Sequence, residues 1–444
     1  MSTNTFNSLK RKIERKQITV GIVGLGYVGL PLSLLFSKRN IKVIGFDIDL
    51  NKIKELEEGR SYINHIEDKL IHDSLNGSFL PSSNFSLVSG CDIVIICVPT
   101  PLNKNREPDL SFINNTLEIL DPYLKQGQLI SLESTTYPGT TEEIIGEFLK
   151  VRGFKVGENI FLSYSPERED PGNTKFSTSN IPKIVSGYSS SCLELAALLY
   201  SLISDTIHKV STTKAAEMTK LLENIYRSVN IGLVNEMKIL AIEMDIDIFE
   251  IIEAASTKPF GFHAHFPGPG VGGHCIPIDP FYLTWKAREY GMNTKFIELA
   301  GEINQEMPKF VFSRLIKALN MRRKAIKGSK INLIGLSYKK NVDDQRESPS
   351  VILMDMIEKN GGIVSYSDPY IPEFKKMRAY NFDKKSQAIN KENLKSYDAA
   401  ILCTDHDIFD YKLIIDNSDI LIDTRGVYAK KEFSKKDYTN LFTA

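Results

Sequence analysis

The chain lacks any excess of charge of one sign. Its 444 residues include 55 Lys and Arg against 55 Asp and Glu, so the formal net charge at pH 7 is zero. Proteins that gather nucleic acid or an anionic membrane surface do so with a field of one sign, which this chain does not have. Any phosphate group that it binds must therefore be held by a local site.

Cysteine is scarce, and its five copies lie far apart without a CxxC pair. The odd count and the wide spacing argue against a disulfide framework and a zinc ribbon, so we expect no metal site. Cys91, Cys97 and Cys403 lie in or beside apolar runs typical of strands, where cysteine usually acts as a small buried hydrophobe. Cys275 has a different neighbourhood, rich in glycine and proline.

Long apolar runs are also absent. No segment reaches the roughly 18 uninterrupted apolar residues that a membrane span needs. Residues 1–16 are polar and basic and have no apolar stretch of the kind found in secretory signals. We therefore expect a cytoplasmic protein with a mobile or helical leader over residues 1–16.

Short apolar runs alternate with amphipathic stretches between Ile18 and about Ser204, which predicts a parallel, doubly wound α/β sheet. From about Thr212 to Met244 apolar residues recur at intervals of three and four, which predicts a helix of roughly 30 residues and ~45 Å. So long a helix usually spans between domains or joins two subunits. After a second helical region, strand-like runs resume, and we place domains at 17–205, 206–328 and 329–444.

A glycine-rich turn joins the first predicted strand to the first predicted helix. It reads Gly24-Leu-Gly26-Tyr27-Val28-Gly29, and the next predicted strand ends in Asp47. In such a turn the first glycine permits the tight bend, the second lets backbone approach a pyrophosphate, and the third allows close helix packing. The helix N-terminus adds amide donors for phosphate. Asp47 can accept bonds from ribose hydroxyls and would repel a 2′-phosphate, so NAD is favoured over NADP.

Three further polar clusters follow predicted strands. Thr100 comes after the third strand, Thr135 after the fourth, and Glu167 with Arg168 after the fifth. Strand ends in doubly wound sheets border the ligand crevice, so we expect these residues on one rim.

The segment 267–280, here called the thiol loop, contains four glycines and four prolines around Cys275. Such a backbone can approach a ligand closely while staying stiff between turns. Cys275 follows a Gly-Gly pair and has Asp279 four residues on, which favours a reactive thiolate over a buried structural cysteine. On the long helix, Lys220 and Asn224 share one face and form a donor pair suited to an oxyanion.

Four stretches together resemble the UDP-glucose/GDP-mannose dehydrogenase family: GPGVGGHCIPIDPFYL, the Gly24–Gly29 turn with Asp47, KLLENIYRSVN and KKNVDDQRESP. The resemblance covers nearly the whole chain after the leader. It implies two Rossmann-like doubly wound α/β domains joined by a long central helix: an NAD-binding domain, a central helical dimerisation domain and a domain for the UDP-sugar. It also implies oxidation of a sugar 6-hydroxyl to a carboxylate in two NAD-linked steps, without release of the aldehyde. The implied partners are a UDP-sugar and a second copy, as a homodimer or larger homo-oligomer.

Site roles follow from the same resemblance. Cys275 would attack the C6 aldehyde to give a thiohemiacetal, and later a thioester that water hydrolyses. Lys220 and Asn224 would stabilise oxyanions, Asp279 and Thr135 would organise water, and Glu167 matches a glutamate implicated in base chemistry. The cofactor contacts would be Gly24, Gly26, Tyr27, Val28, Gly29, Asp47, Thr100, Thr135 and Arg346. The substrate contacts would be Glu167, Arg168, Lys220, Asn224, Arg227, Gly272 and Lys339.

Two departures bear on the sugar. The UDP-glucose branch has Asn-Pro-Glu-Phe where this chain has Ser165-Pro-Glu-Arg168, and Ser where it has His274. Together with Pro171-Gly172, these residues resemble the branch that acts on UDP-N-acetylglucosamine. UDP-N-acetylmannosamine, UDP-N-acetylgalactosamine and UDP-glucose stay open, as does the base for thioester hydrolysis. The resemblance implies that the uronic acid serves surface polysaccharides.

Two other functions are weaker alternatives. A two-electron dehydrogenase of the β-hydroxyacid type would explain the Rossmann turn and the Lys-x-x-x-Asn helix, but neither the thiol loop nor a third domain. A non-catalytic NAD sensor would leave the matched catalytic positions without purpose.

Overall fold

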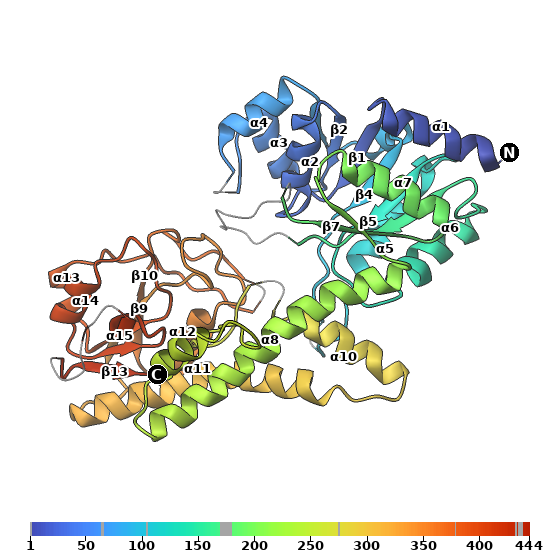
Figure 1. The fold of residues 1–444 in the computed structure, drawn as a ribbon. Helices are drawn as coiled ribbons and strands as arrows, with labels where there is room; N and C mark the ends of the chain where they lie inside the picture. Colours follow the sequence, from blue (N-terminus) through green and yellow to red (C-terminus); the bar gives the residue numbers. More distant parts are fainter. Residues whose placement is uncertain are drawn as a thin grey trace. The chain divides into compact units, whose positions relative to one another are not determined.

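The computed structural model describes residues 2–63, 66–103, 105–168, 180–273, 276–377, 379–430, 433 and 438–444. Its backbone divides into two compact units (Figure 1). Unit one is Met1–Glu223 with Phe281–Met292, and unit two is Asn224–Pro280 with Asn293–Ala444. No helix in the described part of the chain is both long and apolar enough to cross a membrane.

Unit one is built on an eight-stranded sheet. Its order is β3 (Phe79–Ser82), β2 (Lys42–Phe46), β1 (Thr19–Val23), β4 (Ile93–Ile96), β5 (Leu129–Leu132), β6 (Phe161–Tyr164), β7 (Lys183–Gly187) and β8 (Ile207–Lys209). Its central strands β4, β5 and β6 are short buried runs, mostly apolar, because helices cover both faces. Two apolar clusters lie on opposite faces, one containing Val20 and Ile22 and the other Val23. That alternation is what a strand with a period of two produces.

One pairing differs from the prediction of a wholly parallel sheet. β7 runs antiparallel to β6, with Ser163 opposite Gly187 and Tyr164 opposite Ser186. An antiparallel neighbour needs no crossover helix, so a run of strand-like sequence does not by itself reveal its direction. The reversal brings the beginning of β7 to the edge where β5 and β6 end.

The helices of unit one follow the alternation in the sequence. They are α1 (Ser2–Glu14), α2 (Gly29–Lys38), α3 (Leu50–Glu57), α4 (Asp68–Leu75), α5 (Ser111–Leu120), α6 (Glu147–Val151), α7 (Ser190–Ser201) and α10 (Asp279–Glu289), with short helical turns η1 (Phe85–Gly90), η2 (Asp121–Tyr123) and η3 (Thr141–Gly146). Of the two states expected for the leader, the structure shows the helical one. Leu9 and Ile13 of α1 are buried, and Phe6 meets the Phe161 ring edge-on at 6.1 Å.

The long predicted helix is α8 (Thr213–Glu243), close to the expected 212–244. In unit two it is followed by α9 (Ile248–Ser256) and α11 (Lys295–Met321). α8 and α11 approach closely at Gly232, where a Cβ atom would lie 3.2 Å from the Cα of Ala300. The second helical region, predicted after the thiol loop, consists of two helices, α10 and α11.

The second sheet is wholly parallel. Its order is β10 (Ile363–Ser367), β9 (Lys330–Ile334), β11 (Ala399–Leu402), β12 (Leu421–Asp423) and β13 (Leu441–Thr443), with helices α12 (Pro349–Lys359), α13 (Lys391–Lys395), α14 (Tyr411–Asn417) and α15 (Val427–Lys430). α12 is followed by Gly361 at φ 83°, a conformation that favours glycine after a helix. The chain thus carries two doubly wound sheets with α8 between them in sequence, as the resemblance implied.

Candidate active site

The glycine turn of unit one has the geometry that a dinucleotide needs. Gly24 has φ 93° and lies so near the next loop that a Cβ atom would stand 2.6 Å from the carbonyl oxygen of Cys97. A Cβ atom on Gly29 would lie 1.9 Å from the carbonyl oxygen of Gly24. α2 begins at Gly29, so its amide donors and the positive end of its dipole face the turn.

Gly26 differs from both of these glycines, because no atom of the described residues beyond its chain neighbours lies within 4 Å of the position that its Cβ would take. Open space above the middle glycine is what close approach of a pyrophosphate requires. Asp47, at the end of β2, is buried, and its carboxylate accepts the amides of Leu25 and Asp49, each at 2.9 Å. Lys52 also reaches it at 3.2 Å, a contact that sequence reasoning missed. The turn and its acid therefore fit a dinucleotide.

The three predicted rim residues do follow adjacent strands. Thr100, Thr135 and Glu167 come after β4, β5 and β6, which are parallel neighbours in the sheet. Thr100 is buried, and its carbonyl oxygen accepts a hydrogen bond of 2.9 Å from the hydroxyl of Tyr282 in α10. Ser134, beside Thr135, donates to the carbonyl oxygen of Val98 at 2.7 Å. Strand-end loops from two neighbouring strands are thus tied to one another.

Glu167 belongs to a cluster of buried charges that sequence reasoning did not foresee. Lys183, the first residue of β7, places its ammonium 2.9 Å from Oε2 of Glu167 and 2.9 Å from Oε2 of Glu133. Burial raises the pKa of Glu133 despite the nearby ammonium. Burial would raise the pKa of Glu167 too, but Lys183, the Arg168 amide and Lys220 together lower it. Lys183 reaches the two glutamates because β7 runs antiparallel to β6. A lysine at the start of a strand does not by itself reveal that strand's direction.

Lys220 and Arg168 are both anchored within unit one. The ammonium of Lys220 donates to the carbonyl oxygen of Glu167 at 2.6 Å. The guanidinium of Arg168 pairs with Glu223, one turn further along α8, at 2.6 Å. Arg227, the third member of the polar set on α8, is exposed. Lys220 and Glu223 of α8 are therefore bound to the loop after β6.

In unit two, Asn224 and Asp279 are brought together. Both side chains are buried, and the amide of Asn224 donates a short hydrogen bond to Oδ2 of Asp279. Asp279 is the first residue of α10, where the helix dipole favours a carboxylate. Asp279, four residues after the predicted nucleophile Cys275, is thus held by Asn224, a predicted oxyanion donor.

The thiol loop packs against the QRESP segment of the same unit. Gly273 has φ 83°, and its amide donates to the carbonyl oxygen of Arg346 at 2.9 Å. A Cβ atom on Gly272 would lie 2.6 Å from the Cβ of Tyr338, so both glycines are sterically required. The guanidinium of Arg346 pairs with Asp344 at 2.6 Å, and Lys339 is half-buried nearby in sequence. Cys275 and His274 lie outside the described residues.

The second sheet repeats the turn of the first with one change. Gly335 has φ 87°, and the amide of Leu336 donates to Asp368 at 2.7 Å, just as that of Leu25 donates to Asp47. Asp368, however, is also contacted at 3.1 Å by Nε2 of the buried His406. Asp47 is contacted by the half-buried side chain of Lys52, whereas the partner of Asp368 is a fully buried imidazole.

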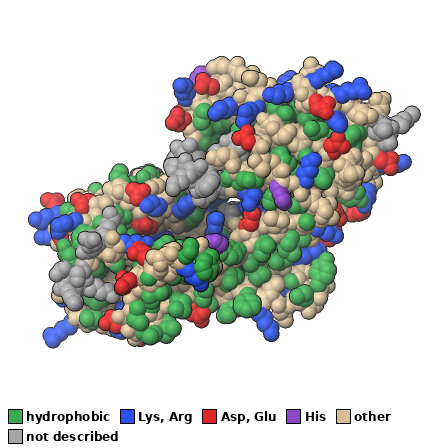
Figure 2. Space-filling model, viewed as in Figure 1, with side chains coloured by type: hydrophobic (Ala, Val, Ile, Leu, Met, Phe, Trp, Pro, Cys, Tyr) green, Lys and Arg blue, Asp and Glu red, His purple; other side chains and the backbone are tan. Residues whose placement is uncertain are grey.

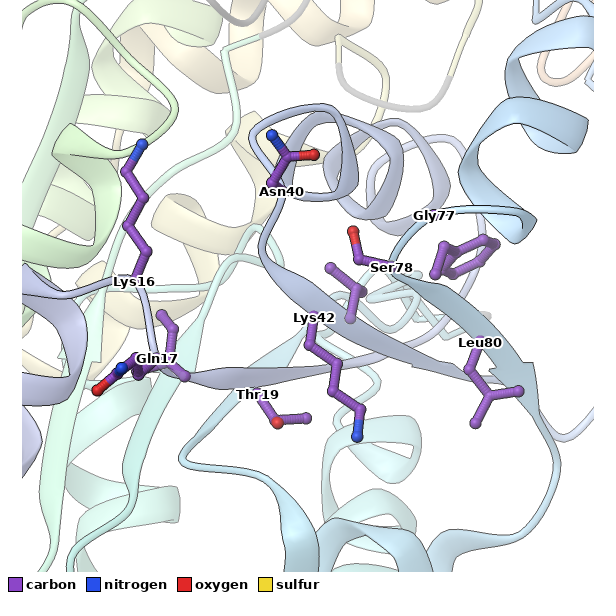
Figure 3. A pocket seen from close by; sticks show the side chains of 11 residues that line it. Lys16, Gln17, Thr19, Asn40, Lys42, Gly77, Ser78 and Leu80 are labelled. Atoms are coloured by element: carbon purple, nitrogen blue, oxygen red, sulfur yellow. The ribbon is translucent and has the colours of Figure 1, made fainter.

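A pocket of about 540 Å³ lies at the opposite edge of the first sheet, where β1, β2 and β3 begin (Figure 3). Thr19, Lys42 and Phe79 line it together with Lys16. The ammonium groups of Lys16 and Lys42 point in opposite directions, so they do not converge on one ligand. Ligands of doubly wound sheets bind at the carboxyl ends of strands, and this pocket is at the other end.

Comparison with known proteins matches all three parts of the chain to one family. Its NAD binding domain matches residues 18–204, its central domain residues 214–306, and its UDP binding domain residues 332–430. The chain belongs to the UDP-glucose/GDP-mannose dehydrogenase family. It is therefore an NAD-dependent oxidoreductase that acts on a nucleotide sugar.

Individual members of the family resemble the chain over most of their length. The UDP-N-acetyl-D-glucosamine 6-dehydrogenase of Pseudomonas aeruginosa is 35% identical over 89% of this chain and 92% of its own. The UDP-N-acetyl-D-mannosamine dehydrogenase of Methanococcus aeolicus is 35% identical over 90% and 87%. The solved structure of the UDP-D-ManNAc dehydrogenase from Pyrococcus horikoshii superposes with a TM-score of 0.85, at 30% identity over 96% and 99%.

Membership of this dehydrogenase family explains the difference between the two acid–turn pairs. The turn with Asp47 lies in the NAD binding domain, and the turn with Asp368 lies in the UDP binding domain. The second turn also reads Gly335-Leu-Ser in place of the full glycine pattern, which agrees with a UDP binding domain.

Proposed function

We propose that the protein oxidises the C6 hydroxyl of a UDP-N-acetylhexosamine to the carboxylate, with UDP-N-acetylglucosamine as the favoured substrate. The observation that carries this proposal is the buried hydrogen bond from Asn224 to Asp279, four residues after Cys275. A two-electron dehydrogenase has no use for a thiol four residues before that acid in the sequence. A four-electron oxidation needs an intermediate that stays bound between its two steps, and a thiol adduct provides one.

The cofactor and the thiol divide the chemistry between them. NAD⁺, bound at Gly24–Gly29 and Asp47, supplies the oxidant for each of the two oxidations. The Cys275 thiolate adds to the C6 aldehyde and holds the carbon as a thiohemiacetal and then as a thioester. Water finally cleaves the thioester and releases the acid and the free thiol. Thr135 and Asp279 are assigned to that water.

Lys220 and Asn224 are assigned to the oxyanions that develop on the C6 oxygen. An ammonium has three N–H donors and a side-chain amide two. Lys220 gives one bond to the carbonyl oxygen of Glu167, and Asn224 gives one to Asp279, so each retains donor capacity. Donors fixed before the reaction stabilise charge without reorganising, which is the main advantage of such a site.

The choice among sugars rests on the residues around the motifs. Ser165-Pro-Glu-Arg168 and His274 resemble the branch that acts on acetamido sugars, and the three relatives compared above carry names of acetamido sugar dehydrogenases. One is named for the glucosamine and two for the mannosamine, so UDP-N-acetylmannosamine is the first alternative. UDP-N-acetylgalactosamine and UDP-glucose follow.

A substrate panel tests the proposal. The full-length protein is incubated with NAD⁺ and, separately, with the UDP derivatives of glucose and of N-acetylated glucosamine, mannosamine and galactosamine, while NADH is followed. We expect two NADH per sugar oxidised and the highest kcat/KM with the glucosamine. One NADH per sugar would contradict the four-electron reaction, and a preference for UDP-glucose would contradict the sugar assignment.

We also propose a homodimer or a larger homo-oligomer formed through α8. Large apolar side chains are exposed along this helix at Leu222, Leu233 and Leu240, and just after it at Met244, each at 53% or more. Hydrophobic side chains gather over the part of the surface where α8 is drawn (Figure 2). Contiguous apolar surface of this kind usually marks a protein interface. Light scattering on the purified protein tests this, and a monomer at micromolar concentration would contradict it.

A further inference from the structure

The buried charge cluster of unit one contains a residue to which no role has yet been given. Lys183 opens β7, and because β7 is antiparallel to β6, its ammonium lies at the edge where β5 and β6 end. It bridges Glu133, just after β5, and Glu167, just after β6, at 2.9 Å to each. The Lys183 side chain is only 4% exposed and that of Glu133 is fully buried. Glu167 is 12% exposed, so the three groups form a cluster that is largely shielded from water.

The balance of charge in this cluster is uneven. Two carboxylates share one ammonium, and removal of either partner from a buried ion pair leaves the other uncompensated. Burial would lower the pKa of Lys183, yet its two carboxylate partners raise it, so the ammonium stays charged. The same ammonium is the principal group that lowers the pKa of Glu167 against the effect of burial. Glu133 keeps a raised pKa, and its Oε1 has no hydrogen-bond partner among the described residues.

Among the described residues, the groups that face Glu167 come from several elements of unit one. Lys183 comes from β7, Lys220 from α8, and the amide of Arg168 donates to Oε1 at 2.8 Å. Cys97 after β4 and Tyr200 of α7 face the cluster from the Glu133 side. The carboxylate of Glu167 is therefore fixed at both oxygens, and its own carbonyl oxygen receives the ammonium of Lys220.

We propose that Lys183 is a positioning residue for the reaction: it holds Glu167 ionised in one orientation and, through the backbone of Glu167, keeps Lys220 in place. Glu133 is its second counter-charge and takes no part in the chemistry. The effect on turnover rests on the proposed function, in which Glu167 and Lys220 act at the C6 carbon. The effect on Glu167 itself does not depend on that function.

Two variants of similar size separate positioning from mere structure. Lys183→Met removes the ammonium from both carboxylates, whereas Glu133→Gln breaks only the Lys183–Glu133 ion pair. If the cluster were simply structural, both would act alike. If Lys183 serves Glu167, only Lys183→Met leaves Glu167 buried without its cation, and Lys183→Arg restores the charge.

The first measurement is kcat against pH for the full-length protein with NAD⁺ and UDP-N-acetylglucosamine. For Lys183→Met we expect kcat at pH 7 to fall about tenfold or more. We also expect the pH below which kcat falls, the acidic limb of the profile, to rise by about one unit or more. A buried carboxylate that has lost its cation has a higher pKa. In Lys183→Arg the acidic limb should lie near its wild-type pH. In Glu133→Gln the limb should lie at the wild-type pH or below it. A fall in kcat with the limb unmoved, or the same upward shift in both variants, would overturn the proposal.

The second measurement needs no substrate. A carboxylate whose folded pKa is lowered stabilises the fold above its unfolded pKa and ceases to do so as pH falls. The gap in Tm between wild type and Lys183→Met should therefore be widest near pH 7 and should narrow toward pH 4. A gap that is equal at both pH values would reject the role of Lys183. This result stands even if no UDP-sugar is oxidised, so failure of the proposed function and failure of this inference are distinguishable.

Discussion

The side-chain amide of Asn224 donates a hydrogen bond to the carboxylate of Asp279, although 55 residues of chain separate them. Asn224 lies on α8 and Asp279 opens α10. The bond therefore fixes one end of the thiol loop to the helix that carries the predicted oxyanion donors. Both partners are buried, so neither can exchange this bond for one with water.

Asn224→Ala should destabilise the protein by about 1–3 kcal/mol, because it leaves the buried Asp279 carboxylate without its amide donor. A double-mutant cycle with Asp279→Asn, measured by urea unfolding, should give a coupling energy of about 0.5–3 kcal/mol. Asn230→Ala is the matched control, since this amide on the same helix bonds only the carbonyl oxygen of Tyr226 at the surface. Additive effects of the Asn224 and Asp279 changes would contradict the coupling.

Gly26→Ala and Gly29→Ala should have different effects on stability and on cofactor binding. A methyl group at Gly26 meets open space, so Tm should stay near the wild-type value while the Kd for NAD⁺ rises about tenfold or more. A methyl group at Gly29 would lie 1.9 Å from the carbonyl oxygen of Gly24, so Tm should fall even without the cofactor. Calorimetric titration and thermal melts measure the two effects. Unchanged NAD⁺ affinity in Gly26→Ala would place the pyrophosphate elsewhere.

Glu217 should make stability depend on pH. It is buried and accepts the amides of Gly139 and Thr141, yet burial raises its pKa from 4.5 to about 7. Folding therefore favours the protonated form of Glu217. Its contribution to the unfolding free energy is complete below about pH 4.5 and is lost as pH rises through about 7.

Glu217→Gln should remove that dependence. Relative to this variant, the wild type should lose about 3 kcal/mol of unfolding free energy between pH 4.5 and 8, since one pKa unit corresponds to about 1.4 kcal/mol. Urea unfolding across this range gives the two curves, and Glu236→Gln, an exposed change on the same helix, is the control. Parallel curves for wild type and Glu217→Gln would show that Glu217 is ionised throughout.

Cys275→Ala should abolish formation of the acid, because the second oxidation has no bound thiohemiacetal to act on. Lys220→Ala should slow the reaction without preventing NAD⁺ binding, since its ammonium is bound to the carbonyl oxygen of Glu167 and not to the glycine turn. Mass spectrometry of the product and calorimetry with NAD⁺ provide the measurements. An unchanged rate of acid formation in the cysteine variant would dispose of the covalent mechanism.

Local sequence determined much of this protein. Apolar spacing placed α8 within a residue or two, glycine positions marked the first turn, and strand ends brought Thr100, Thr135 and Glu167 to adjacent strands. These features were readable because periodicity and backbone conformation are dictated by neighbouring residues. The pairing of Asn224 with Asp279 was not foreseen as a contact, although both residues were singled out.

Only the tertiary structure decided the direction of β7 and the partners of the buried charges. An apolar run has the same composition in either direction, so the local sequence did not predict the ion pairs of Lys183 with Glu133 and Glu167. In the same way, Asp47 and Asp368 follow similar strands, but Asp47 is contacted by Lys52, near it in sequence, and Asp368 by His406, distant in sequence. Sequence specifies which groups are available and where each strand ends, whereas the electrostatics of a buried group depend on charges that the fold brings from elsewhere in the chain.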